Sequence, residues 1–128
     1  MLRQGDRCPA PGARAAQPLG RAAKALNQMV RERTGRTRDD GVGMMHGVFS
    51  ADAAGQAARL LLSTLTDHSK RDEQDGIRFL LAGVQAAIAN VDKHAELAVE
   101  GLAHAMELLA IISFLARVVD RCQRVDST

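Results

Sequence analysis

The sequence predicts an all-α fold, a small bundle of about three helices with a long C-terminal helix, and three observations support this class. Apolar residues recur at spacings of three and four along most of the chain after residue 50. Strand-like alternation of apolar and polar residues does not rise above noise in any segment. Residues 93 to 124 contain no proline, so one long helix can run through most of them.

Residues 1–43 differ from the rest of the chain in charge and composition. They hold nine Lys and Arg against four Asp and Glu, a net charge of +5, whereas the whole chain carries +2. They also contain all three prolines and six of the eleven glycines. A segment of this kind buries too little apolar surface to offset the entropy lost on ordering. We therefore expect a basic, flexible N-terminal tail over residues 1–43 and an all-helical interaction domain over residues 44–128.

Two weak elements are expected before the first helix of that domain. Helical spacing over residues 21–33 predicts a short helix that ends at Thr34-Gly35 and frays in isolation. Residues 36–47 lack periodicity and contain three glycines, so they are expected to form a linker.

Two helices are then expected, separated by a polar turn. Ser50 is a plausible N-cap, and alanines and leucines at helical spacing predict a helix over residues 51–67. Residues 69–75 are wholly polar and predict a turn, with acids suited to the first turn of the next helix. Apolar residues from Ile77 to Val91 predict the second helix, which Gly76 and Gly83 weaken locally.

The third and longest helix is expected to follow a break near residues 90–93 and to run to about Arg124. One side carries a heptad seam, which predicts an antiparallel hairpin with the second helix and consists of Ala98, Leu102, Ala105, Leu109, Ile112, Ala116 and Val119. The opposite side begins with acids and histidine but becomes apolar in its last three turns. The end of this helix is therefore apolar on two sides, and both need cover.

The apolar end of the third helix is the predicted interface, formed by Leu108, Ile111, Phe114, Leu115 and Val118. One interpretation is that the first helix folds back and covers these residues within one protomer. The other is that a second chain covers them, since the alanine-rich first helix offers little width for both tasks. We favour the second, so the bundle is expected to be completed by dimerisation or by another protein.

Catalytic chemistry is not predicted from this sequence. Ser113 and Cys122 lie among apolar residues without the base and orienting group that a nucleophile requires. His104 and Glu107 form a single His-x-x-Glu motif, whereas helical di-iron sites need paired motifs on separate helices. We expect a non-enzymatic protein with no cofactor and no metal ion.

Nucleic-acid binding is the alternative function. The basic segment over residues 31–38 supplies the candidate contacts, Arg31, Arg33, Arg36 and Arg38, which would gain affinity by releasing counterions. The chain has no Tyr or Trp and only three Phe, so stacking on bases is not expected. A solvated arginine-rich tail explains the same residues.

The expected location is the cytoplasm, with no membrane contact. Residues 1–25 lack the apolar run of a signal peptide, and two cysteines do not make a disulfide framework. The most apolar run, residues 108–116, has about half the roughly 20 residues that a membrane span needs.

The segment from Met45-His46-Gly47-Val48-Phe49-Ser50 to Leu115-Ala116-Arg117-Val118-Val119-Asp120-Arg121-Cys122 resembles the QslA-like antiactivators of quorum sensing in its size, its alanine-rich helices and their order. This family blocks LuxR-type transcription regulators. The resemblance implies a helical homodimer that binds the ligand-binding domain of such a regulator, disturbs its dimerisation and keeps it from DNA. The basic tail is not part of the resemblance.

Overall fold

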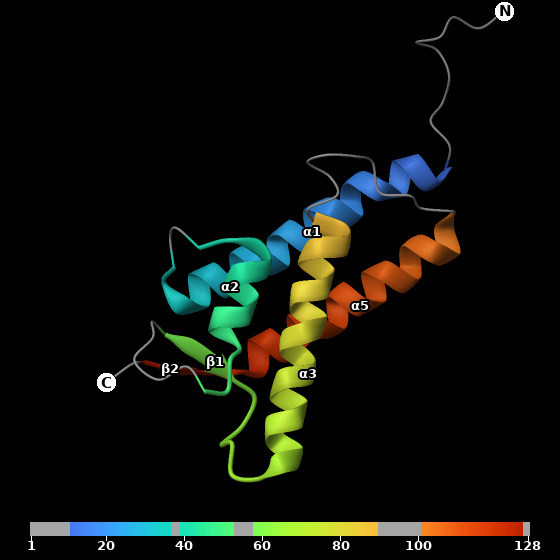
Figure 1. Cartoon of the computed structure of the whole chain (residues 1–128). Helices are drawn as coiled ribbons and strands as arrows, with labels where there is room; N and C mark the ends of the chain where they lie inside the picture. The colour runs from blue at the N-terminus through green and yellow to red at the C-terminus, as the bar shows by residue number, and fades with distance from the viewer. Residues whose placement is uncertain (1–10, 37–38, 53–57, 90–100, 127–128) are drawn as a thin grey trace, which may run out of the picture.

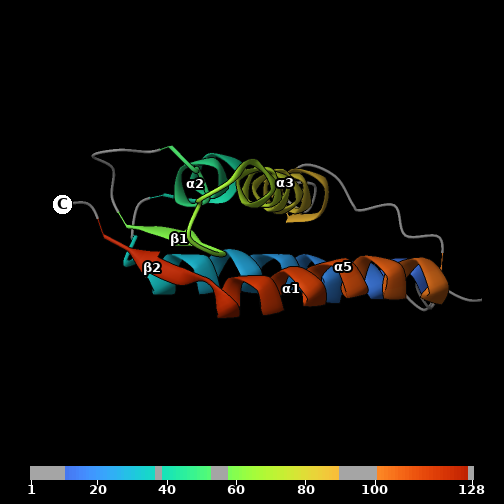
Figure 2. The ribbon, with the colours of Figure 1, turned by 90° about the horizontal axis from the view of Figure 1, so that it is seen from below.

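The structure, a computed structural model, describes residues 11–36, 39–52, 58–89 and 101–126. Within these ranges the predicted all-α class is confirmed, and the sheet has only two short strands. The elements are α1 (Pro11–Thr34), α2 (Gly41–Val48), β1 (Arg59–Leu61), α3 (His68–Val84), the π-helical turn η2 (Gln85–Ala89), α5 (Leu102–Arg121) and β2 (Gln123–Val125). Helices α1 and α5 lie side by side in one layer, and α2 and α3 form the other (Figure 1, Figure 2).

Helix α1 overturns the prediction of a flexible tail over residues 1–43, because it packs into the core. Its buried side chains recur at spacings of four, three and four: Leu19, Ala23, Leu26 and Val30. Pro18 lies inside the helix, where it removes one backbone hydrogen bond. The prediction rested on the prolines and glycines, which lower the intrinsic helix propensity of this segment. Packing against α5 stabilises the helix by more than these residues destabilise it. Residues 1–10 lie outside the described residues.

The predicted end of the first helical segment, at Thr34-Gly35, is confirmed. Gly35 has a φ of 69°, a backbone conformation that glycine adopts without steric cost. The amide of Arg36 donates to the carbonyl of Arg31 over 3.2 Å, which is the six-to-one hydrogen bond of a Schellman motif.

Helix α2 corrects the prediction of a linker over residues 36–47. The side chain of Asp40 caps the helix by accepting a hydrogen bond from the amide of Gly41 over 2.9 Å. Met44, Met45 and Val48 are buried in the core. The glycines hid this short helix, whose stability comes from burying these three side chains rather than from its own propensity.

Strand β1 replaces the helix predicted over residues 51–67, of which residues 53–57 are not described. Its residues pair antiparallel with β2, in the register Arg59 with Val125, Leu60 with Arg124 and Leu61 with Gln123. The buried Gln74 of α3 fixes this segment, since its Nε2 donates to the carbonyls of Phe49 and Leu60, each over 3.0 Å. A short apolar run suits either a strand or a helix, and here the pairing with β2 decided.

Helix α3 begins at His68, so the predicted turn over residues 69–75 forms its first two turns. Asp67 caps it by accepting from the amide of Lys70 over 2.9 Å. The helix predicted from Ile77 is confirmed as far as Ala89, where η2 ends. Residues 90–100, which include the predicted break, lie outside the described residues.

Helix α5 packs along α1 and runs in the same direction, instead of forming the predicted hairpin with α3 (Figure 1). The guanidinium of Arg33 on α1 caps the end of α5 by donating to the carbonyls of Val119 (2.6 Å), Asp120 (3.1 Å) and Cys122 (2.6 Å). The heptad seam is only partly buried. Ala105, Ile112 and Val119 are in the core, but Leu102 and Leu109 are 72% and 49% exposed. The prediction of a heptad seam assumed that one helix packs along this side of α5. In the structure α5 packs against α1 and against the second layer, so a different set of its side chains is buried.

Candidate functional site

The structure divides the predicted interface into buried and exposed residues. Leu115 and Val118 are core residues, so their assignment to a protein interface is wrong. Leu108 is partly buried, whereas Ile111 and Phe114 are 44% and 51% exposed. The cover within the protomer does not come from the predicted helix over residues 51–67, which β1 replaces, and cover by a second chain stays a prediction. The second layer of the protomer covers one side of α5, and the other side remains open.

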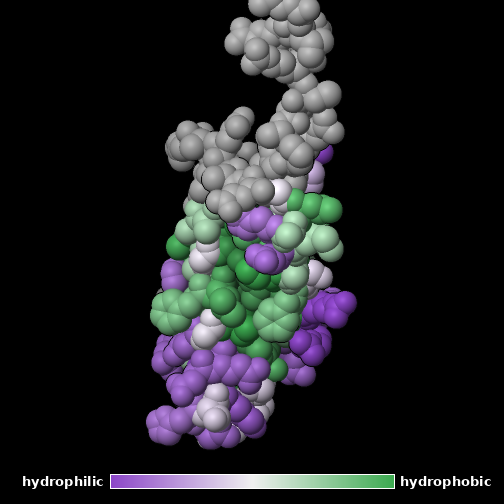
Figure 3. Space-filling view, turned by 90° about the vertical axis from the view of Figure 1, so that its right-hand side faces the viewer, coloured by the Kyte–Doolittle hydropathy of each residue, from purple (hydrophilic) through white to green (hydrophobic). Residues whose placement is uncertain are grey.

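An apolar groove runs between α3 and α5 with a volume of about 390 Å³. Two of the predicted interface residues line it from α5, Leu108 and Ile111. The opposite wall and floor come from α3 and η2, through Gly76, Phe79, Leu80, Gly83, Val84, Ala87 and Ile88. We call this site the groove. Figure 3 shows a continuous hydrophobic surface in the middle of this side of the molecule, with hydrophilic residues along its lower edge.

Two glycines open the groove. Gly76 and Gly83 lie in the interior of α3, and a Cβ built on either would meet no atom within 4 Å. Neither has the positive φ that favours glycine. Because glycine in a helix interior costs roughly 0.5–1 kcal/mol relative to alanine, the fold of this chain gives no reason for either residue. Their effect is to leave two exposed positions of the α3 lining without side chains, above the buried Val84 and Ile88.

Phe79 stands at the edge of the groove and is held in place although it is 60% exposed. The guanidinium carbon of Arg78 lies 4.4 Å from the centre of its ring, and the His46 ring meets it edge to face at 6.1 Å. Arg78 Nη1 in turn lies 2.8 Å from His46 Nδ1. Since a guanidinium only donates, this nitrogen of His46 accepts, which places the imidazole proton on Nε2.

Sequence analysis missed the α3 side of the groove. The apolar residues from Ile77 onward predicted only a helix, and the glycines were treated only as weak points of that helix. The available signal was the repeat of Gly76, Gly83 and Ala87 at spacings of seven and four, which places small residues on one face of α3.

Arg33 and Arg36, two of the four arginines predicted to contact nucleic acid, have partners inside the protomer. Besides Arg33, which caps α5, Arg36 pairs with Asp39 over 2.5 Å and donates to the carbonyl of Ala58. Arg31 is half-buried beside a polar cavity, and Arg38 lies outside the described residues. This geometry does not favour the nucleic-acid alternative, because the charges of Arg33 and Arg36 are already used inside the protomer.

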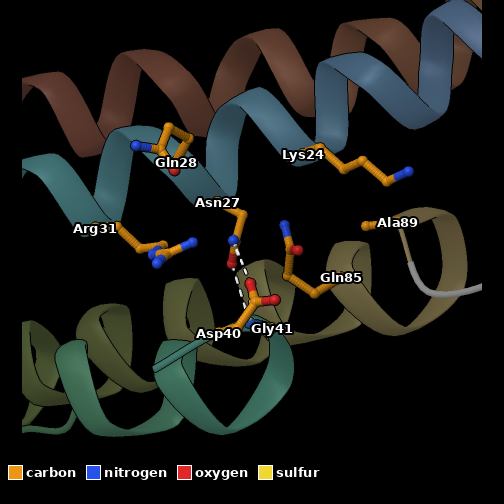
Figure 4. A pocket seen from close by; sticks show the side chains of 8 residues that line it. All are labelled: Lys24, Asn27, Gln28, Arg31, Asp40, Gly41, Gln85 and Ala89. Atoms are coloured by element: carbon orange, nitrogen blue, oxygen red, sulfur yellow. Dashed lines mark hydrogen bonds between the residues drawn. The ribbon is translucent and has the colours of Figure 1, made fainter. Parts of the chain in front are cut away.

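The polar cavity has a volume of about 230 Å³ and lies where α1, α2 and η2 meet (Figure 4). Asn27 joins two of these elements, since its side chain donates to Asp40 and accepts from the amide of Gly41 over 3.0 Å. Gln85 Nε2 joins the third by donating to the carbonyl of Ala23 over 3.1 Å. Asn27, Asp40 and Gln85 therefore act as ties between the elements.

Two further findings concern chemistry elsewhere in the described residues. No group of three or more His, Cys, Asp and Glu side chains there is placed to hold a metal ion. Burial of the thiol raises the pKa of Cys122 to about 11, against the lowering effect of Arg33 and Arg121. A thiol with so high a pKa stays protonated and is a poor nucleophile at neutral pH.

Helix α5 is, within the described residues, long and apolar enough to cross a membrane by length and composition alone. Its most apolar window of 18 residues has a mean hydropathy of 1.8, and 28% of that window is buried in the protomer. Core helices of soluble proteins pass the same test, so the finding assigns no location. It does show that much of the apolar surface of α5 is left open.

The family comparison covers most of the chain. A family model described as "Protein of unknown function (Hypoth_ymh)" matches residues 15–119. No curated protein and no solved structure matches the chain. The matched range includes α1, so it crosses the boundary predicted between residues 43 and 44 and agrees with the packing of α1 into the core.

Proposed function

We propose that this chain, which belongs to the Hypoth_Ymh family of proteins of unknown function, is a non-enzymatic protein–protein interaction module whose groove binds an amphipathic helix of a partner protein. The observation that carries the proposal is the pair Gly76 and Gly83. Two destabilising residues without a role in the protomer point to a role outside it. On the exposed lining of an apolar groove, that role is to let another backbone approach closely.

The dimensions and lining of the groove fit a helix. Its α3 wall extends over twelve residue steps, from Gly76 to Ile88, or about 18 Å at 1.5 Å per residue. A partner helix of about three turns, with apolar residues at spacings of three and four, matches that length. Asp72 is exposed one turn before Gly76 and has no ion pair in the described residues, which favours a basic residue at that end of the partner.

Phe79 is the expected anchor of the complex. Binding usually costs entropy, because exposed side chains must be fixed in one rotamer. Arg78 and His46 already restrict the Phe79 ring in the free protein, so most of that cost is met before the partner arrives. Aromatic side chains that a partner buries completely often dominate binding energy, and Phe79 would become such a residue if the partner helix covers it.

The finer proposal is a regulatory one, that the partner is a LuxR-type transcription regulator and the chain acts as an antiactivator in the cytoplasm. It depends on the sequence resemblance described above. If a regulator dimerises through an apolar helix, the groove would compete for that helix. The regulator would then no longer dimerise or bind DNA.

The test compares Phe79→Ala with Leu102→Ala, a matched truncation of an exposed apolar residue outside the groove. Binding to the purified ligand-binding domains of LuxR-type regulators from the same cells is measured by calorimetry. We expect Phe79→Ala to weaken binding about 30-fold or more, as for other anchor residues, and Leu102→Ala to change it little. Equal effects of the two changes would contradict the groove. Phe79-dependent binding of a different protein would keep the groove but reject the LuxR-type partner.

A further inference from the structure

We infer that the exposed side of α5 is the surface through which two copies of this chain associate, with their α5 helices antiparallel. This surface, the outer face, consists of Leu102, Ala103, Met106, Glu107, Leu109, Ala110, Ser113, Phe114 and Arg117. All of these residues are exposed, and none of them lines the groove. The inference therefore goes beyond the proposed function and stands or falls separately from it.

The apolar area of the outer face matches what a stable dimer needs. Leu102, Met106, Leu109 and Phe114 are each about half exposed or more. At roughly 200 Å² for a fully exposed large side chain, they present on the order of 450 Å². A standard interface takes about 800 Å² from each partner, and somewhat more than half of it is apolar. A single helix face thus supplies the apolar part of such an interface.

The shape of the outer face suits a second copy of the same helix. The midpoint of α5 falls between Ile111 and Ile112. An antiparallel copy centred there places Ala110 opposite the partner's Ser113, so small residues meet where the helices cross and the axes can approach to about 8–10 Å. The same alignment sets Leu109 against the partner's Phe114. It also sets Met106 and Leu102 level with the partner's Arg117 and Arg121, whose aliphatic stems can cover them.

The charges of the outer face also complement themselves in this orientation. Glu107 lies in the first half of α5 and Arg117 in the second, and neither has an ion pair in the described residues. The antiparallel alignment brings Glu107 beside the partner's Arg117, and the two-fold symmetry repeats this pair. A parallel alignment would instead place like charges together.

A second copy explains this face better than a lipid surface does. Glu107, Ser113 and Arg117 fall within the apolar stretch rather than on a separate polar side, as a helix lying in a membrane interface requires. Charged residues of opposite sign at matching distances from a midpoint are instead what a symmetric protein interface uses.

The test compares Leu109→Glu with Leu80→Glu, the same substitution at two leucines that are 49% and 50% exposed on different surfaces. Full-length protein is examined by size-exclusion chromatography with light scattering. We expect wild type and Leu80→Glu to run at twice the chain mass of 13.7 kDa, and Leu109→Glu to run as a monomer. A monomeric wild type, or dissociation by Leu80→Glu alone, would overturn the inference. Met106→Glu repeats the test if circular dichroism shows that Leu109→Glu disturbs the fold.

The orientation is tested by charge reversal. Glu107→Arg should raise the dimer dissociation constant roughly tenfold, since it turns two exposed attractive pairs into repulsive ones, and adding Arg117→Glu should restore it. An equal effect of the single and double changes would reject the antiparallel alignment. Leu109-dependent binding to anionic lipid vesicles by a monomeric wild type would assign the face to a membrane instead.

Discussion

The groove and the outer face of α5 are both apolar and both exposed, yet they are built differently. The groove is concave, and its lining includes two exposed glycines at positions where alanine would stabilise the helix. The outer face is the exposed side of one helix, and Leu102, Met106 and Leu109 on it border a shallow pocket of about 210 Å³ that α1 also lines. A concave surface with two glycines in its lining suits a foreign helix, whereas a helix face that carries charges of opposite sign in its two halves suits its own copy. Exposed apolar area alone does not identify a partner, but its shape narrows the choice.

Both surfaces depend on the position of α5. The largest effect on both is therefore expected when the contacts that hold the end of this helix are removed. Arg33→Ala removes three hydrogen bonds from carbonyls at the end of α5. We expect a loss of about 2–4 kcal/mol in the free energy of unfolding, because charge-assisted bonds are lost and carbonyls are left unpaired. Urea denaturation measures this loss. Arg21→Ala, a change at an exposed arginine of the same helix, serves as the control. Similar stability of the two variants would contradict the capping role.

The same end of α5 should respond to alkaline pH. The pKa of Cys122 is raised from 9.0 to about 11, so the fold favours the protonated thiol, and this stabilisation is complete below pH 9. It should be lost between pH 9 and pH 11, by about 2–3 kcal/mol. Urea denaturation at pH 8 and pH 11 measures the loss. Cys122→Ala should be less stable than wild type at pH 8, but its free energy of unfolding should fall less between pH 8 and pH 11. Equal falls for the variant and wild type would indicate that the thiol is exposed to water.

Gly83→Ala has the smallest expected effect on stability, but it separates the groove from the outer face, because it should affect only the groove. Gly83→Ala should raise the stability of the protomer by about 0.5–1 kcal/mol, since the added methyl group meets no atom within 4 Å. It should also weaken partner binding, because it adds a methyl group where the partner's backbone approaches the groove, and it should leave the mass in solution unchanged. Thermal denaturation, calorimetry and light scattering measure the three effects. A variant that is more stable and binds as well as wild type would refute the role of the glycines.

The elements with strong helical spacing were predictable from the sequence. Residues 77–89 and the long C-terminal helix carry enough apolar residues at helical spacing to be recognised without tertiary information. The end of α1 at Gly35 was predictable for a local reason, since glycine readily takes the backbone conformation that closes a helix.

The errors came from segments whose state depends on distant residues. Helix α1 is poor in local propensity and was assigned to a tail, but α5 covers its apolar stripe. Leu60 and its neighbours were assigned to a helix, but pairing with β2, some sixty residues later, makes them a strand. Two residues of the predicted interface were assigned wrongly for the same reason. Val118 and Leu115 read as surplus apolar residues, and only packing against the second layer removes them from the surface.

The helical class and the excess of apolar residues along the last helix follow from the sequence alone, because periodicity and hydropathy are local properties of the chain. Which apolar residues of that helix stay exposed, and on which surface, follows from how the helices pack. That choice depends on contacts between segments as far apart as Arg33 and Cys122, which no local pattern encodes. The groove arose in the same way, since Gly76 and Gly83 become a site only when α5 lies beside them.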